Sequence, residues 1–304
     1  MSALTSDYSP IVTVTDLRLD YGNGVGLAGM SLTIPARGVT AVIGPNGAGK
    51  TTLFTVLTGL ITPDSGEFAV APGVGPIAYC PDTPAFEPWL TAREVVDQSR
   101  ILSRSSIETS RLEILGRCGL ADAARRRVAG FSRGMTQRLG IAATIATNAT
   151  LMILDEPSSA LDPIGRLQVL DLLRDLGRTR SVVLSSHSLA DVEKVAEHLV
   201  VIDHGRTIYQ GDLDTLLQQH ADPVWIVRTH DRAGELRDLL AREDSVVASE
   251  VVSSTTVRVR MASMDAGERN LSGMLARSGF PIVESVLERR DLDAAFARII
   301  GEDS

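Results

Sequence analysis

The chain has 304 residues, of which 44% are hydrophobic, and a net charge of −8. This length allows one large domain and a smaller one. The acidic balance argues against nucleic acid as a partner, because proteins that bind it carry basic patches. The uncharged stretch of residues 139–154, which no other in the chain exceeds, is shorter than the roughly 20 apolar residues that span a bilayer, so we expect no direct membrane insertion.

The first part of the chain predicts short strands. Apolar and polar residues alternate there and are interrupted by glycine and proline, which is typical of half-buried strands. The segments with this pattern are 12–22, 29–35, 38–44, 66–72 and 75–81. A helix is expected to begin within GKTTLFTVLTGL and to stop at Gly59.

Residues 44–51 read GPNGAGKT, the complete phosphate-loop pattern GxxxxGK[ST] between a predicted strand and a predicted helix. In this pattern glycines let the backbone wrap phosphates, Lys50 reaches the β- and γ-phosphates, and Thr51 binds Mg²⁺. Only two of the 30 basic residues are lysines, Lys50 and Lys194, so a lysine at position 50 is itself informative. The predicted nucleotide-binding residues here are Gly44, Pro45, Asn46, Gly47, Ala48, Gly49, Lys50, Thr51 and Thr52.

The middle of the chain predicts helices. A helical segment is expected from about Thr91 to Leu120, with Thr91 and Glu94 in capping-box spacing. A second helix is expected from Ser132 to Ala146. Ser132 and Gly134 stand at its start, where free backbone N–H groups can face an anion. The chain therefore predicts two helix starts suited to phosphate.

Polar residues end two of the predicted buried strands. Asp155 and Glu156 follow LMIL, and His187 follows SVVLSS. The first carboxylate is a candidate Mg²⁺ ligand, and Glu156 is a candidate for polarising a water molecule. The alternatives are a solvated strand end for the carboxylates and a structural hydrogen bond for His187. Tyr21 is a candidate for stacking on a base, or an ordinary half-buried tyrosine.

The segments beyond His187 complete an alternating pattern. SLADVEKVAEH predicts a helix with Ser188 and Asp191 in capping-box spacing, and residues 199–211 predict a hairpin. Strands that alternate with helices predict a parallel sheet, whose ligands bind at the carboxyl ends of the strands. Cys80 and Cys118 lack the spacing of a metal site or redox pair, so we interpret them as reduced structural thiols.

The composition changes near Asp222, and the remainder reads strand, helix, strand, strand, helix, strand, helix. This order matches a split βαβ pattern and predicts a small α+β domain. We therefore predict a nucleotide-binding domain over 1–220, with a helical subdomain at about 83–147, and an accessory domain over 221–304.

These motifs together resemble the ATP-binding cassette (ABC) ATPases. FSRGMTQRL is similar to the signature motif of that family, SSALD at 158–162 to its D-loop, and SSH to its switch histidine. The resemblance covers about residues 11–215. It implies an α/β phosphate-loop NTPase core with antiparallel β and helical subdomains, which binds ATP and Mg²⁺ and hydrolyses ATP with Lys50, Glu156 and His187.

The resemblance also accounts for two phosphate-binding helix starts in one chain. ATPases of this family dimerise head to tail, so that each ATP lies between the phosphate loop of one copy and the signature helix of the other. Ser132 and Gly134 would then donate to the γ-phosphate held by the Lys50 of the second copy. Tyr21 occupies the position that stacks on adenine.

Asp82 departs from the family pattern. The family places glutamine at this position, after the strand that corresponds to GPIAYCP, where it contacts Mg²⁺ or the attacking water. Asp82 is predicted as a further Mg²⁺ ligand, reached through a water, with a simple turn residue as the alternative.

In the signature motif of this chain, Arg133 replaces the first glycine of the usual pair. This variant, the single cassette and the C-terminal extension together resemble the ATPase subunits of daunorubicin-resistance-type ABC-2 exporters. This implies a homodimer that drives an integral-membrane permease from the cytoplasmic face of the cell membrane, with residues 83–130 contacting the permease. The alternative is a soluble ABC ATPase that is not part of a transporter and acts in regulation, translation or on DNA.

Overall fold

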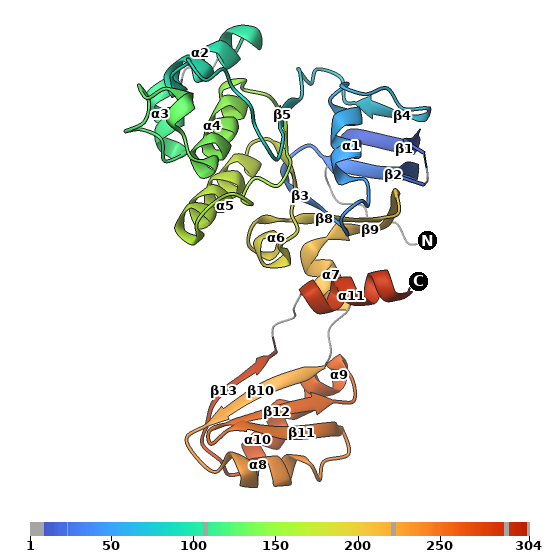
Figure 1. Cartoon of the computed structure of the whole chain (residues 1–304). Coiled ribbons are helices and arrows are strands. Elements are labelled where there is room, and N and C mark those ends of the chain that lie inside the picture. The colour runs from blue at the N-terminus through green and yellow to red at the C-terminus, as the bar shows by residue number, and fades with distance from the viewer. Residues whose placement is uncertain (1–8, 23, 106–108, 220–222, 289–291, 303–304) are drawn as a thin grey trace. The chain divides into compact units, whose positions relative to one another are not determined.

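The computed structural model describes residues 9–22, 24–105, 109–219, 223–288 and 292–302. The chain divides into two compact units, Met1–Asp214 together with Ile299–Ser304, and Thr215–Arg298. Among the described residues, the first unit contains two sheets and the second unit contains one (Figure 1). The boundary predicted between 220 and 221 falls outside the described residues.

A six-stranded sheet forms the centre of the first unit. Its strands, in spatial order, are β5 (Ala78–Cys80), β6 (Leu151–Leu154), β7 (Ser181–Ser185), β3 (Gly38–Ile43), β8 (His198–Asp203) and β9 (Arg206–Asp212). Neighbouring strands are parallel except for the β8–β9 hairpin. Strands β3, β6 and β7 are buried along their whole length, because a parallel sheet is covered on both faces. The predicted parallel sheet and hairpin are confirmed.

A smaller antiparallel sheet packs beside it, with the order β2 (Gly26–Pro35), β1 (Pro10–Asp20) and β4 (Ser65–Val70). One hydrophobic cluster joins the two sheets through helix α1 (Lys50–Leu57). It includes Leu17 of β1, Met30 of β2, Phe54 of α1 and Ile153 of β6. Burial of these side chains fixes α1 against the end of β3, which is where the phosphate loop lies.

The helices α2 (Ala92–Leu102), α3 (Arg111–Arg117) and α4 (Arg133–Ala146) form a helical group, with a short 3₁₀ turn at Val128–Gly130. Thr91 and Glu94 make the predicted capping box at the start of α2. The single helical segment predicted for 91–120 is instead two helices. Arg104, at φ 51°, takes the left-handed conformation that ends α2, and Ser110 caps α3.

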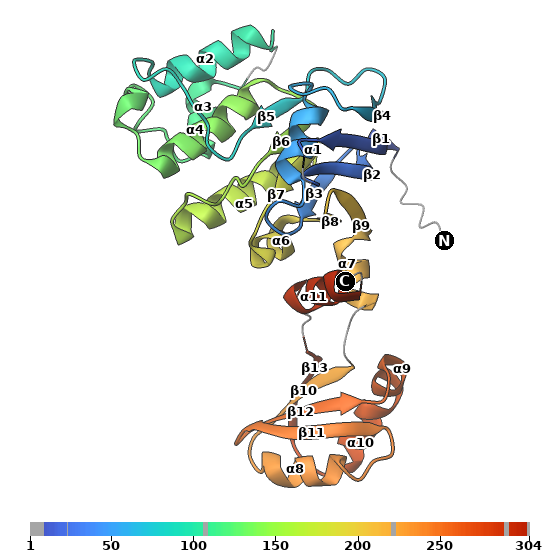
Figure 2. The same cartoon turned by 45° about the vertical axis from the view of Figure 1, so that its right-hand side comes forward.

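Two further helices complete the first unit. Helix α5 (Pro163–Gly177) packs against β3 and β7, and α6 (Leu189–Val195) packs against α5 (Figure 2). No helix was predicted at 163–177, although Pro163 at the first helical position is a recognised start signal.

The second unit has a four-stranded antiparallel sheet of order β11-β12-β10-β13. In chain order its elements are β10 (Val224–Thr229), α8 (Ala233–Leu240), β11 (Val246–Ser253), β12 (Thr256–Met261), α9 (Met264–Ala266), η2 (Gly267–Leu271), α10 (Ser272–Arg277) and β13 (Ile282–Leu287). Helices α7 (Leu213–Gln219) and α11 (Leu292–Glu302) flank them in sequence. This is the split βαβ order expected from the sequence.

Trp225 anchors the core of the second unit. It is 8% exposed and clusters with Val257 and Leu236. A Cβ atom at Gly267 would lie 1.9 Å from the indole ring. Glycine at this position therefore lets the helical turn approach the ring closely.

Candidate functional site

The loop between β3 and α1 carries the GPNGAGKT motif. A Cβ atom at Gly44 would lie 2.1 Å from the carbonyl oxygen of Ile202 in β8, so only glycine allows this approach. Gly49 precedes α1 with φ 105° and offers no side-chain cap. The first N–H groups of α1 are therefore not satisfied by a capping side chain, which suits them to an anion.

Lys50, the first residue of α1, extends back along this loop. Its Nζ donates to the carbonyl oxygens of Gly44, at 2.8 Å, and Pro45, at 3.0 Å. Burial lowers the pKa of Lys50, while the charges of Glu156 and Asp155 act in the opposite direction. The ammonium group thus lies over the loop and within the field of both strand-end carboxylates. Of the other loop residues, Pro45, Asn46 and Gly47 are exposed and Ala48 is buried.

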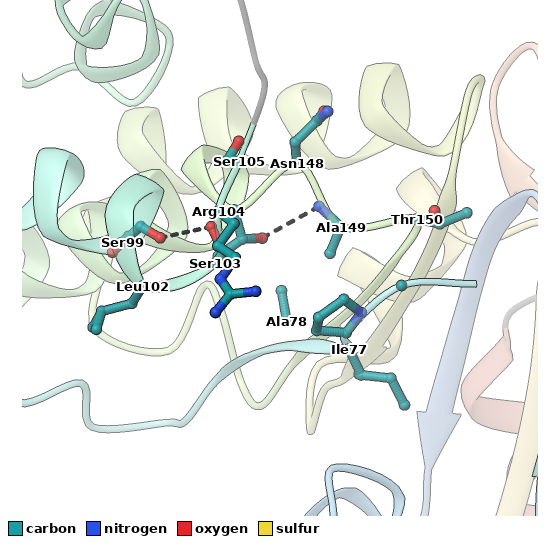
Figure 3. A pocket seen from close by; sticks show the side chains of 13 residues that line it. Ile77, Ala78, Ser99, Leu102, Ser103, Arg104, Ser105, Asn148, Ala149 and Thr150 are labelled. Atoms are coloured by element: carbon teal, nitrogen blue, oxygen red, sulfur yellow. Dashed lines mark hydrogen bonds between the residues drawn. The ribbon is translucent and has the colours of Figure 1, made fainter. Parts of the chain in front are cut away.

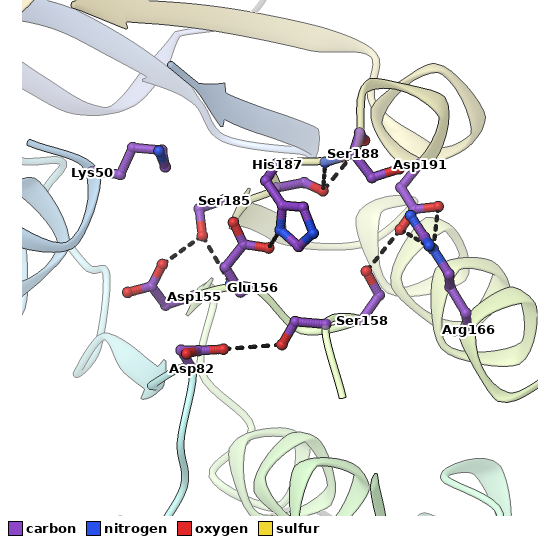
Figure 4. A network of polar contacts seen from close by, with 12 residues as sticks. Lys50, Asp82, Asp155, Glu156, Ser158, Arg166, Ser185, His187, Ser188 and Asp191 are labelled. Carbon is purple, nitrogen blue, oxygen red and sulfur yellow. Dashed lines mark hydrogen bonds and ion pairs between the residues drawn. The ribbon is translucent and has the colours of Figure 1, made fainter. Parts of the chain in front are cut away.

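Asp155 connects the phosphate loop to two strand ends. It follows β6, is 3% exposed, and accepts a hydrogen bond from Thr51 Oγ1 at 2.7 Å. Its other carboxylate oxygen accepts from Ser185 Oγ of β7 (Figure 4). The structure therefore brings together Thr51 and Asp155, the two predicted Mg²⁺ ligands that come from different motifs.

Glu156 and His187 also meet at this edge of the sheet. Glu156 Oε2 lies 2.7 Å from His187 Nδ1. Glu156 has φ 48°, and its N–H donates to Ser185 Oγ at 2.8 Å. A non-glycine residue in this conformation is held there by its surroundings. The carboxylate is thus oriented by its backbone and by the imidazole (Figure 4).

The donors that Mg²⁺ prefers are oxygen atoms of carboxylates and hydroxyls. Thr51 and Asp155 supply such atoms and fit the ion. In the described part of the chain, no group of three or more His, Cys, Asp or Glu residues could hold a metal by itself. Asp82, the third predicted ligand, accepts a hydrogen bond from Ser159 Oγ at 3.0 Å. Its part in binding Mg²⁺ stays a prediction.

Ser132 and Gly134 lie at the start of α4, as predicted. Ser132 is exposed and caps the helix, accepting from Met135 N at 3.2 Å. In both overall views α4 lies with α2 and α3 to one side of the six-stranded sheet, whereas α1 lies beside β1 and β2. The two helix starts therefore belong to different parts of the unit.

Tyr21 directly follows β1 and is 55% exposed. Its backbone N–H donates to Val25 O at 2.9 Å, which closes the turn toward β2. Tyr21 is therefore presented on the surface, and its part in stacking on a base stays a prediction.

The comparison with known proteins agrees with this geometry. The family model described as ABC transporter matches residues 27–159. The ABC transporter ATP-binding protein YxlF of Bacillus subtilis is 31% identical over 300 residues, covering 95% of this chain and 99% of that protein. The chain belongs to the ATP-binding proteins of ABC transporters. It is an ATP-binding and ATP-hydrolysing subunit, and its fold is that of the ABC ATPases.

Further relatives of this ABC ATPase have more specific names. The daunorubicin resistance ATP-binding protein DrrA3 of Streptomyces coeruleorubidus is 31% identical, covering 96% of both chains. The bacitracin transport ATP-binding protein BcrA of Bacillus licheniformis is 26% identical, covering 96% of this chain and 98% of that protein. A solved ATP-binding subunit of an ABC transporter superposes with a TM-score of 0.60 at 27% identity, over 69% of this chain and 92% of that one.

Three polar residues near the site of the ABC ATPase, Ser158, Arg166 and Asp191, were not predicted to contact one another. Asp191 of α6 is 2% exposed and accepts from Ser158 Oγ, at 2.7 Å, and from Arg166 Nε of α5. The predicted capping box is wrong, because Ser188 makes no side-chain cap and Asp191 faces the interior. Ser158 lies within the SSALD motif, and this motif was the one feature of the sequence that linked the turn to the site.

Among the described helices of the ABC ATPase, none is both long and apolar enough to cross a membrane.

Proposed function

We propose that this ATP-binding subunit powers an exporter, and that two copies bind two ATP molecules head to tail. Each ATP would lie between the phosphate loop of one copy and the start of α4 of the other. The separate placement of α1 and α4 in one chain supports this arrangement. The exporter branch is supported by relatives named for daunorubicin resistance and bacitracin transport.

The phosphate loop holds the triphosphate in this proposal. The ammonium of Lys50 exchanges its contacts with the carbonyls of Gly44 and Pro45 for the β- and γ-phosphates. A charged oxygen is the stronger acceptor, so the exchange favours the bound nucleotide. Tyr21, exposed at the end of β1, stacks on the adenine ring.

Thr51 and Asp155 would hold Mg²⁺ through their hydroxyl and carboxylate oxygens. The ion supplies positive charge that screens the phosphate oxygens during transfer. The Asp155 carboxylate is preorganised to bind the ion, because hydrogen bonds from Thr51 and Ser185 already orient its two oxygens. Its burial also keeps the carboxylate from turning toward solvent.

Glu156 polarises the attacking water, and His187 contacts the γ-phosphate. The Glu156–His187 contact of 2.7 Å keeps the two side chains in one orientation. On the opposite side of the phosphate, Ser132 and the backbone at Gly134 of the second copy donate hydrogen bonds. Neutralising the phosphate from both sides stabilises the charge of the transition state.

The observation that carries the proposal is the convergence of Thr51, Asp155, Glu156 and His187 at one edge of the sheet. Its test is the variant Glu156→Gln. We expect ATP binding to be retained, turnover to fall at least about 100-fold through loss of the base, and an ATP-dependent dimer to accumulate. ATPase assays and light scattering with and without ATP measure these outcomes. Hydrolysis near the wild-type rate would remove Glu156 from this role.

A hollow beside β5 is the proposed contact for the permease. It has a volume of about 510 Å³ and lies between the segment before β5, the end of α2 and the loop between α4 and β6 (Figure 3). Leu102, in its lining, is 77% exposed, and the neighbouring Ile101 is 75% exposed. Exposed apolar residues beside a hollow are typical of protein interfaces. The permease would hold the subunit at the cytoplasmic face of the membrane.

Co-purification tests the permease contact. We expect the Glu156→Gln variant, solubilised mildly from its host with ATP and Mg²⁺, to carry a multi-span membrane protein in stoichiometric amount. Adding Leu102→Asp should remove that protein, whereas Leu112→Asp should not, because Leu112 of α3 is 56% exposed and outside the lining. A soluble dimer without a membrane partner, or one with ribosomal or DNA-bound proteins, would instead favour a role outside transport.

A further inference from the structure

The turn of residues 157–162, which follows Glu156, is held by side chains from three other elements. Ser158 Oγ donates to the buried Asp191 of α6 at 2.7 Å. Asp162 lies 3.6 Å from the guanidinium of Arg138 in α4. Ser159 Oγ donates to Asp82, which lies in the loop that follows β5, at 3.0 Å.

The two adjacent serines differ in their surroundings. Ser158 is 6% exposed and its partner Asp191 is 2% exposed, so this contact is a buried anchor. Ser159 and Asp82 are both exposed, so their hydrogen bond can form or break without leaving a buried polar group unpaired. Of the two contacts, the hydrogen bond between Ser159 and Asp82 is therefore the one that can change with the position of the loop (Figure 4, dashed line from Asp82).

Ser159 is also linked to Glu156 through the backbone. The N–H of Ser159 donates to the carbonyl oxygen of Glu156 at 3.2 Å. Glu156 has a positive φ, a conformation that its contacts must maintain. Movement of Ser159 therefore acts directly on the residue whose carboxylate contacts His187.

The loop 81–90 that carries Asp82 is tied to the helical group at its other end. Pro81, Pro84 and Pro88 restrict its backbone. Pro84 is buried against α4, where a Cβ atom at Gly140 would lie 2.6 Å from its ring. Ala129 N donates to Pro88 O at 3.0 Å. A displacement of the helical group is thus passed along a stiff loop to Asp82.

We propose that Asp82 and Ser159 form a positioning pair, through which the loop 81–90 sets the 157–162 turn and the orientation of Glu156. This inference rests on the proposed function, since it assigns a means of controlling that same site. Asp82 acts here through Ser159 and has no need to contact the metal. The hollow beside β5 is lined in part by Ala78, the first residue of the strand that leads directly into this loop, so occupation of the hollow would reach Glu156 by this route.

Four variants of the full chain test the pair: Asp82→Ala, Ser159→Ala, both together, and Asp82→Asn. We expect each alanine variant to lower kcat about fivefold, the effect of losing one ordinary hydrogen bond, with the KM for ATP unchanged. The double variant should be no slower than either single one, because both remove the same contact. Asp82→Asn should stay near the wild-type rate, since its amide oxygen still accepts from Ser159.

A second measurement does not depend on hydrolysis. Hydrogen exchange of the backbone amides over 155–162 should be faster in both alanine variants, by a similar factor, and unchanged in Asp82→Asn. If the wild-type chain failed to hydrolyse ATP, the proposed function would be wrong. The exchange rates over 155–162 would still show whether Asp82 and Ser159 position the turn.

Three outcomes would overturn the positioning pair. One is additive losses of kcat in the double variant, and another is wild-type kcat and exchange in both alanine variants. The third is a raised Mg²⁺ requirement in Asp82→Ala and Asp82→Asn alike, with Ser159→Ala silent. That last pattern would make Asp82 a metal ligand, as the sequence alone predicts.

Discussion

Each of the two units contains a network in which an arginine binds one or two carboxylates, and these carboxylates differ in burial. In the first unit Arg166 binds Asp191, whose side chain is 3% exposed. In the second unit Arg258 of β12 bridges Glu250 and Glu288, and these side chains are 41%, 63% and 33% exposed. Arg166 and Arg258 are exposed to a similar extent, 36% and 41%, so the contrast lies in the burial of the carboxylates that they bind.

Burial decides how much each network matters. A buried carboxylate that loses its partners stays in a medium of low dielectric, which is costly. An exposed ion pair is screened by water and salt and contributes little. We infer that the first network fixes the position of the turn after Glu156, whereas the second adds a small increment to an already formed sheet.

The largest expected effect concerns a further charged group of the first unit, the ammonium of Lys50. Lys50→Ala should lower the affinity for ATP at least about 100-fold, because charge-assisted hydrogen bonds contribute about 1.5–3 kcal/mol each. Titration calorimetry measures the loss. Lys194→Ala is the matched control, since it removes the same charge from an exposed position of α6. Equal losses in both variants would show that net charge, and not the placement of Lys50, governs binding.

Breaking the buried network should give the next largest effect. Asp191→Ala leaves Arg166 and Ser158 without their acceptor and should lower the free energy of unfolding of the first unit by about 3 kcal/mol. Hydrogen exchange of β6 and β7 reports on this unit, and that of β10 and β12 on the other. The second unit should be unaffected. An unchanged exchange rate in β6 and β7 would place Asp191 among the dispensable surface charges.

This network also shows where sequence reasoning stops. The phosphate loop was predictable because its residues are contiguous and each has a defined role in binding phosphate or Mg²⁺. Asp155, Glu156 and His187 were predictable because carboxyl ends of parallel strands meet at one edge of a sheet. Asp191 was assigned to Ser188 because three-residue spacing is the mark of a capping box. Its real partners come from other elements, and sequence distance alone does not reveal them.

Local backbone geometry accounts for the remaining differences. One helical segment was expected over 91–120, and the left-handed turn at Arg104, between α2 and α3, occurs at a residue type that gives no signal for it. Asp82 was compared with a glutamine that contacts the metal, but which hydroxyl its shorter side chain reaches depends on the fold of the turn at 157–162. The order of strands and helices in the second unit followed from its alternating pattern alone.

Buried thiols in the first unit provide a smaller, pH-dependent effect. Burial raises the pKa of Cys80 and Cys118 from 9.0 to about 12. Above pH 9 the unfolded thiols lose protons that the folded ones retain, so the stability they provide is complete below pH 9 and lost as pH rises toward 12. Each thiol should contribute on the order of 1 kcal/mol of this loss per pH unit. Urea unfolding at pH 8 to 10 measures it.

The control for this prediction is the double variant Cys80→Ala and Cys118→Ala, whose alkaline slope should be shallower. Exchange in β10 and β12 should keep the same pH dependence in the variant and the wild type, because both thiols belong to the first unit. A slope unchanged by the double variant would assign the alkaline loss to other groups, of which Tyr79, with its pKa raised to about 12 by burial, is the next to replace.

The exposed network should give the smallest effect of all. Arg258→Gln removes the ion pairs with Glu250 and Glu288 but keeps part of the aliphatic stem over the sheet, so it should destabilise the second unit by less than about 1 kcal/mol. Hydrogen exchange of β10 and β12 in low and high salt measures the change, which salt should reduce further. A loss as large as that of Asp191→Ala, and insensitive to salt, would mean that Arg258 is shielded from solvent in the working assembly. The open face of this sheet would then be an interface, and the contrast between the two networks would no longer be one of burial.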